Sequence, residues 1–239
     1  MQKKSLKKTI ILSVLFFLPV LFLLFLYPSK HNYNPLDVVE ENILNVTDFK
    51  DEDGNNIDLT DNITVLGFFG SNTMNQSTAA SNLKELIYDK FKGFKRFQVL
   101  ILVPQGSQEQ VSELRKELLK YDELKYWHFG YSHPQDILNV FNSLKSTVSL
   151  NENNATSHVF IVDQDLNQRG RIDDRTDTEI EVNKAVYSMN SYNCIKVAQL
   201  KNKISEDIRI LFTEYRQKRK GNFDSSSRRA DDIKTNEEN

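Results

Sequence analysis

The run FQVLILV, at residues 97–103, constrains the fold more than any other part of the sequence. It is almost continuous in apolar side chains, whereas a strand with one solvent-facing side alternates apolar and polar residues. We expect it to be the central strand of a sheet that is covered on both faces. The run therefore predicts a layered α/β domain.

The segments around this run alternate between strand and helix patterns. The apolar stretch 64–69 stops at Gly70. The following segment then places Leu83, Leu86 and Ile87 on one helical face. Continued to the end of the chain, this order predicts a three-layer α/β domain with a central mixed sheet, closed by a hairpin and a long helix. The expected strands are 64–69, 97–103, 125–129, 158–162 and 168–172, and the expected helices are 76–91, 108–120, 132–144 and 195–217.

An uncharged apolar segment, residues 9–27, precedes this domain. At about 1.5 Å per residue it spans ~28 Å, which is close to the thickness of a bilayer core. A cleaved signal peptide is the competing interpretation, but the apolar run is long for one and no A-x-A-like site follows it. We therefore expect one retained transmembrane helix. The lysines that should hold its N-terminus in the cytoplasm are Lys3, Lys4, Lys7 and Lys8.

Composition changes divide the chain into five expected segments. Residues 1–8 form a basic cytoplasmic segment, residues 9–27 the anchor and residues 28–44 a linker. Residues 45–217 form the folded domain. Residues 218–239 are rich in charge and poor in apolar side chains, so we expect a disordered tail.

Charge and the scarce metal-ligating residues exclude several functions. Beyond residue 30 the chain has 26 basic and 33 acidic residues, a formal charge near −7, which argues against nucleic acid as a partner. The four histidines (His31, His128, His133 and His158) show no metal-ligand spacing. Cys194 is the single cysteine, so it cannot form an intramolecular disulfide. It is either a buried small apolar side chain or a reactive thiol.

The stretch GFFGSNTMNQSTAASNLKEL, at residues 67–86, runs from strand to helix. In many thiol and metal-handling domains this junction carries the working cysteines, because a helix N-terminus stabilises a thiolate. Here the junction has no cysteine. Ser71, Asn72 and Thr73 are residue types that suit a helix N-cap, and we expect that role for them.

Taken in order, these motifs resemble the Sco/SenC family. The likeness covers residues 45–215 and includes D-x-x-G before the first strand, VLGFFGS, WHFGYSHPQDI and HVFIVDQDLNQRGRID, together with the N-terminal anchor. Proteins of this family are membrane-anchored, have a thioredoxin fold similar to that of peroxiredoxins, and help to deliver copper to cytochrome oxidase. The resemblance implies a thioredoxin-like domain in the periplasm, anchored by a single pass in a bacterial inner membrane.

The family's copper chemistry uses a C-x-x-x-C pair and one histidine. Counted from the shared Phe69 and Gly70, the cysteine positions fall at Met74 and Thr78. Counted back from the hairpin strand, the histidine position falls near Ala155 rather than His158. Successive side chains of a strand alternate faces, so this offset of three residues would turn His158 to the other side if the segment is extended. A thioether is a weak copper ligand, and a hydroxyl cannot exchange electrons as a thiolate does. We therefore expect no catalytic residue and no metal site, with Met74 and His158 as the weak candidates for ligands.

Three functions follow as hypotheses. The first is a non-catalytic accessory or binding factor near the respiratory oxidase or its assembly proteins, which is not an enzyme and needs no cofactor. The second is a copper chaperone that uses other ligands, such as Met74 with His158 or His133. The third is a thiol enzyme that works through Cys194.

Overall fold

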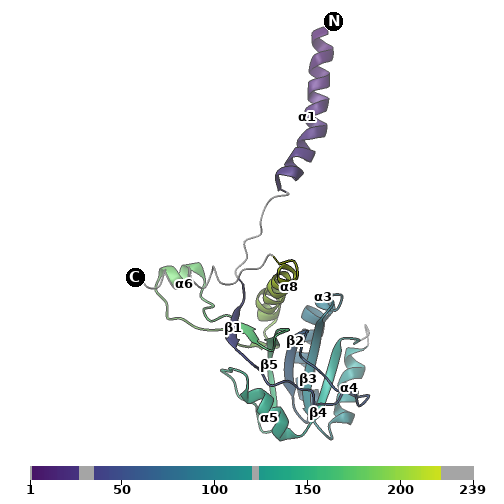
Figure 1. Cartoon of the computed structure of the whole chain (residues 1–239), viewed down its shortest axis with the longest axis vertical. Helices are drawn as coiled ribbons and strands as arrows, with labels where there is room; N and C mark the ends of the chain where they lie inside the picture. The colour runs from purple at the N-terminus through teal and green to yellow at the C-terminus, as the bar shows by residue number, and fades with distance from the viewer. Residues whose placement is uncertain (1, 27–34, 120–123, 222–239) are drawn as a thin grey trace. The chain divides into compact units, whose positions relative to one another are not determined.

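The structure is a computed structural model of the chain. It describes residues 2–26, 35–119 and 124–221, and within residues 2–26 it describes the side chains of 11–22 and 24. Its contacts divide the chain into two units, Met1–Asn34 and Pro35–Asn239 (Figure 1).

The described part of the first unit is the helix α1 (Gln2–Leu26), with Pro19 inside it. Its described side chains are exposed, and apart from Ser13 and Pro19 they are large and apolar. Among the residues that the structure describes, no helix is both long enough and apolar enough to cross a membrane. The expected anchor, residues 9–27, lies partly outside the described side chains.

The second unit is built on a seven-stranded mixed sheet with the order β1-β6-β5-β2-β3-β4, in which β7 pairs with β5 (Figure 1). β2 and β4 are parallel to β3, whereas β5 runs antiparallel to β2 and β6, and β6 runs antiparallel to β1. The strands are β1 Asp37–Glu40, β2 Ile63–Phe69, β3 Phe97–Pro104, β4 Trp127–Ser132, β5 Ala155–Val162, β6 Gln168–Gly170 and β7 Tyr192–Asn193.

The apolar run 97–103 lies in β3, where every residue is buried. Val99 and Ile101 belong to one hydrophobic cluster, and Leu100 and Leu102 belong to another. Successive side chains of a strand point to opposite faces, so the two clusters lie on the two faces of the sheet. β3 is interior but not central, because β5 pairs with the other edge of β2 and these two strands take the middle of the sheet.

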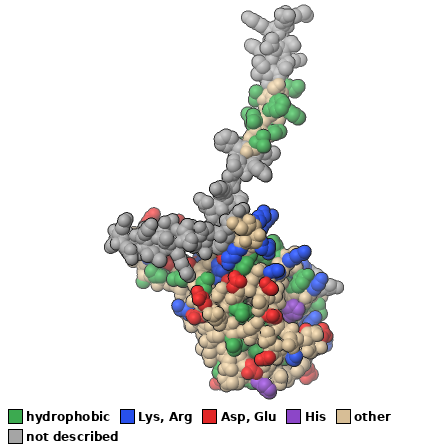
Figure 2. Space-filling model, in the orientation of Figure 1, with side chains coloured by type: hydrophobic (Ala, Val, Ile, Leu, Met, Phe, Trp, Pro, Cys, Tyr) green, Lys and Arg blue, Asp and Glu red, His purple; other side chains and the backbone are tan. Residues whose placement is uncertain are grey.

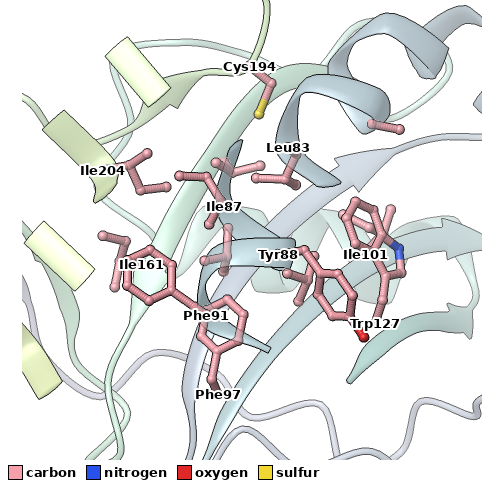
Figure 3. Close-up of a cluster of buried hydrophobic side chains, with 14 of the residues drawn as sticks. Leu83, Ile87, Tyr88, Phe91, Phe97, Ile101, Trp127, Ile161, Cys194 and Ile204 are labelled. Carbon is pink, nitrogen blue, oxygen red and sulfur yellow. The ribbon is translucent and has the colours of Figure 1, made fainter. Parts of the chain in front are cut away.

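Helices cover both faces. Buried residues of α2, α3, α4 and α8 belong to the larger cluster, which Figure 3 shows around Leu83, Ile87 and Phe91. α5 contributes Ile137 and Val140 to the smaller one. The helices are η1 (3₁₀) Thr73–Gln76, α2 Ser77–Leu83, η2 (π) Lys84–Tyr88, α3 Asp89–Phe91, α4 Gln108–Leu118, α5 Pro134–Asn142, α6 Asp177–Glu181, α7 Val197–Gln199, η3 (π) Leu200–Ile204 and α8 Ser205–Arg219.

Along the chain, the strands and helices of the second unit are connected as follows. A parallel β2-α2-β3 unit is followed by α4, β4 and α5, then by the antiparallel hairpin of β5 and β6, and the chain closes with α8. The arrangement is thioredoxin-like. It confirms the expected mixed α/β domain with a central mixed sheet.

Several boundaries differ from the sequence-based expectation, among them the starts of β4 and β5, which lie at Trp127 rather than residue 125 and at Ala155 rather than residue 158. β1 lies inside the expected linker, residues 28–44, because its backbone pairs with β6, which is distant in the sequence. α8 continues to Arg219, two residues beyond the expected end of the domain. The segment between β6 and β7 contains the short helix α6, which begins with a capping box formed by Thr176 and Glu179. Residues 222–239 of the expected tail lie outside the described residues.

Candidate functional site

The site that the sequence singles out lies where β2 ends. Gly70 follows β2 with a φ of 67°, a conformation that is costly for residues with a Cβ atom. A Cβ at this position would clash with the backbone oxygen of Asn153 and lie 2.9 Å from the Cβ of Ala155. The backbone N–H of Ser71 donates to that same Asn153 oxygen at 3.2 Å. Glycine therefore allows the chain to turn tightly against the start of β5.

The helix after this turn does not begin with the expected side-chain cap. It starts as the 3₁₀ turn η1, and neither its N-cap residue, Asn72, nor that of α2, Gln76, makes a side-chain capping hydrogen bond. Ser71 is exposed, whereas Thr73 is fully buried. The Oγ1 atom of Thr73 has no hydrogen-bond partner among the described residues. Asn72 therefore stands at the N-cap of η1, within the expected region, but its side chain makes no capping hydrogen bond, and Thr73 is buried in the core instead.

The three positions that correspond to the family's ligands lie next to this turn. Met74 is half-buried and packs against the larger hydrophobic cluster, and Thr78 is exposed in the first turn of α2. Ala155 is buried and pairs with Phe69, the last residue of β2. Together they offer a thioether, a hydroxyl and a methyl group. This set has one weak soft ligand and no group that can undergo thiol exchange.

His158 lies in an irregular part of β5. The register steps from Phe68 opposite Thr156 to Gly67 opposite Val159, so Ser157 and His158 have no partner on β2. His158 pairs instead with Asn193 of β7, and its backbone N–H donates to Thr156 Oγ1 at 3.3 Å.

In a regular extended strand, the three-residue offset from Ala155 would place His158 on the opposite face. The bulge interrupts this alternation, so the offset does not fix the side of the imidazole. Partial burial lowers the pKa of His158, and the nearby charge of Lys196 lowers it further. The neutral imidazole is therefore favoured.

The remaining histidines are dispersed. His133 is exposed at the N-cap of α5, and His128 is half-buried in β4, where burial lowers its pKa. His31 lies outside the described residues. No group of three or more His, Cys, Asp or Glu side chains in the described part of the chain could hold a metal ion.

Cys194 is completely buried and has a free thiol. It packs in the larger hydrophobic cluster, on the side of Leu83 and Ile204 that Figure 3 shows. Burial raises the pKa of its thiol well above the ordinary value, so the reactive thiolate is disfavoured. Of the two interpretations that the sequence left open for Cys194, the structure therefore favours a buried small apolar side chain over a reactive thiol.

Two clefts lie away from this junction. A cleft of about 400 Å³ near the start of β4 is lined by acidic Asp51, Glu52 and Asp53 and by basic Arg115 and Lys125. Its charges are partly neutralised, because Arg115 forms an ion pair with Glu52.

The second cleft, of about 690 Å³, lies between α8 and the loop after α3 and is strongly basic. None of the candidate site residues singled out in the sequence lines this cleft. The sequence signal that points to it is the spacing along one helix of Arg209, Phe212, Arg216 and Arg219.

Comparisons with known proteins give only distant likenesses. No protein-family profile and no curated protein matches the chain. A putative electron transfer protein from Aquifex aeolicus is 13% identical over 72% of this chain and 90% of its own, with a TM-score of 0.46. The soluble domain of Sco1 from Bacillus subtilis is 14% identical over 72% and 91%, with a TM-score of 0.41. A putative protein disulfide isomerase from Bacteroides thetaiotaomicron is 14% identical over 77% and 93%, with a TM-score of 0.42. None of these likenesses assigns a role to a residue of this chain.

Proposed function

We propose that this chain is a membrane-anchored, extracytoplasmic Sco-like protein that binds a partner during respiratory oxidase assembly and performs no redox or copper chemistry itself. The observation that carries the proposal is the junction after β2. It keeps a strand, a tight glycine turn and a helix start, but Met74, Thr78 and Ala155 stand where the family has its two cysteines and its histidine.

The absence of accessible thiol chemistry supports a binding role. Disulfide exchange needs a thiolate that can reach another sulfur atom. The single thiol, that of Cys194, is completely buried and its pKa is raised. A thiol enzyme would therefore have to unfold part of its own core to react.

The anchor is part of the proposal and rests on the sequence. Residues 9–27 are uncharged and four lysines precede them. A reporter that is active only outside the cytoplasm, fused after residue 220, should be active, and the mature protein should keep its own N-terminus. A mature N-terminus near residue 30 would replace the anchor with a cleaved signal peptide.

A genetic test addresses the accessory role directly. Deleting the gene should lower oxidase activity, and the wild-type chain should restore it. Met74→Leu with Thr78→Val should restore it equally well, because the proposed role uses no ligand at these positions. Unchanged oxidase activity in the deletion strain would refute the assembly role. Failure of the double variant to restore activity would show that the role does need the side chains of Met74 or Thr78.

Copper binding separates this proposal from a chaperone with other ligands. Met74 is the one soft ligand at the junction, and a single thioether binds copper weakly. Titration of the full chain with Cu(I) against a competing chelator should give no tight one-to-one complex. Tight binding that disappears in Met74→Leu would favour the chaperone.

A further inference from the structure

The basic cleft combines five cationic side chains with aromatic rings. The cations are Lys95 and Arg96, from the loop before β3, and Arg209, Arg216 and Arg219 of α8. The residues that line the cleft include no aspartate or glutamate. Figure 2 shows Lys and Arg side chains gathered over the end of the domain where Figure 1 draws α8 and α3.

The aromatic part of the cleft joins the two segments. The rings of Phe94 and Phe212 are stacked, with their centroids 4.5 Å apart. Phe212 lies three residues after Arg209 and four before Arg216, so the three side chains share one face of α8. Phe94 keeps 47% of its surface exposed. The cleft therefore presents an apolar wall directly beside guanidinium groups.

The residues that the structure describes leave most of the positive charge of the cleft without an acidic partner. Arg96 forms an ion pair with Asp61 at 3.2 Å. Within the described residues, no ion pair joins Lys95, Arg209, Arg216 or Arg219 to a carboxylate. The neighbouring Lys90 shows the effect of this charge, because its pKa is lowered by burial and then by Arg209.

We propose that this cleft binds a phosphate ester that carries an apolar group. Arginine suits phosphate because its planar guanidinium can donate two parallel hydrogen bonds to one anion. Five cations can balance more than the single charge of a carboxylate. The stacked Phe94 and Phe212 would contact the apolar group. The volume, about 690 Å³, is in the range of small-molecule sites.

Such a ligand has two sources, a soluble phosphate ester or the headgroup of an anionic lipid. The inference does not depend on the proposed function, since none of the residues that line the cleft is used to support that function. Binding therefore needs to be measured against both sources, with the full chain in an uncharged maltoside detergent and in nanodiscs.

The first arm uses phenyl phosphate and inorganic phosphate with the full chain in detergent. Hydrogen exchange is followed in peptides that cover residues 92–98 and 208–219. Phenyl phosphate should protect both peptides and bind at least about tenfold more tightly than inorganic phosphate, because only the ester reaches the aromatic wall. The second arm compares nanodiscs of phosphatidylcholine with nanodiscs that also contain phosphatidic acid. Protection only in the second arm identifies the lipid as the source.

Matched variants distinguish a site from general positive charge. Arg209→Ala with Arg216→Ala should weaken binding at least about tenfold, since each charge-assisted hydrogen bond contributes about that much. Lys116→Ala with Lys201→Ala removes the same charge from two exposed positions elsewhere and should change binding less than about twofold. Phe94→Ser should weaken binding of phenyl phosphate but not of inorganic phosphate.

Three results would overturn the proposal: no protection in either arm, equal affinity for phenyl phosphate and inorganic phosphate, or equal losses in the two double variants. Thermal unfolding of each variant identifies any loss of binding that follows from a loss of folding. Should the arginine pair fail this control, Phe94→Ser, in an exposed loop, gives the deciding measurement.

Discussion

The guanidinium of Arg169 binds the carboxylate of Glu214 through two hydrogen bonds, from Nη1 to Oε1 at 3.2 Å and from Nη2 to Oε2 at 2.6 Å. Both side chains are almost fully buried. Arg169 also donates to Asp163 Oδ2 at 2.8 Å and to the backbone oxygen of Leu36 at 2.6 Å. Burial alone would lower the pKa of Arg169, but Glu214 and Asp163 raise it, so the arginine stays charged. This cluster fixes β6 and the segment before β1 to the closing helix α8.

Breaking this pair should be costly. In Glu214→Ala, Arg169 would keep its burial and lose one of its two acidic partners, so we expect the free energy of unfolding to fall by about 3 kcal/mol. Glu113→Ala removes an exposed glutamate from α4 and should change it by less than about 0.5 kcal/mol. Urea unfolding of the full chain measures both. A loss below about 1 kcal/mol in Glu214→Ala would show that Asp163 alone compensates Arg169.

The turn at Gly70 should tolerate no side chain. Gly70→Ala would force a positive φ on alanine and place its Cβ against a backbone oxygen, which cannot move away as a side chain could. We expect a loss of more than about 2 kcal/mol in the free energy of unfolding. Gly93→Ala is the matched control, because a Cβ there has no neighbour within 4 Å, and it should be nearly neutral. Equal effects of the two substitutions would mean that the turn differs from the one described.

Restoring cysteines at the junction tests whether the backbone keeps the family's geometry. Met74→Cys with Thr78→Cys places two thiols four residues apart at a helix start, and we expect the variant to gain a Cu(I) site that competition titration can measure. Adding Ala155→His should tighten it, because residue 155 pairs with the last residue of β2.

The matched control for this experiment is Ser112→Cys with Lys116→Cys. These two positions have the same spacing on the exposed surface of α4, away from the turn. If both cysteine pairs bind copper equally, or if neither binds it, the junction has no special geometry for a metal.

The pKa of His158 predicts how stability changes with pH. It is lowered in the folded state by burial and by Lys196, and that of His128 is lowered by burial. A group with a depressed folded-state pKa contributes stability above its ordinary pKa, about 6.5 for histidine, and loses it as the pH falls through the folded-state value. The free energy of unfolding should therefore decline between about pH 7 and pH 5. His158→Gln should flatten that decline, and parallel curves for the variant and the wild type would contradict this account.

Local sequence patterns determined most of the secondary structure. β2, β3, α4 and α5 lie where apolar periodicity predicted strands and helices, because this periodicity depends on neighbouring residues alone. The lack of a second thiol was also readable directly, since Cys194 is the only cysteine in the sequence. These local signals were enough to predict the layered α/β domain.

Tertiary contacts decided the rest. β1 exists because Val38 pairs with Arg169, and His158 lies in a bulge because β5 changes register against β2. Phe94 and Phe212, which are distant in the sequence, stack on each other in the wall of the basic cleft. Each of these features depends on a contact with a segment that is remote in the sequence. A local pattern predicts which side chains are buried, but it does not predict which residues they contact. The sequence therefore showed which chemistry the junction after β2 lacks, and only the folded chain brought Arg209 and Arg216 together with Phe94 in one cleft.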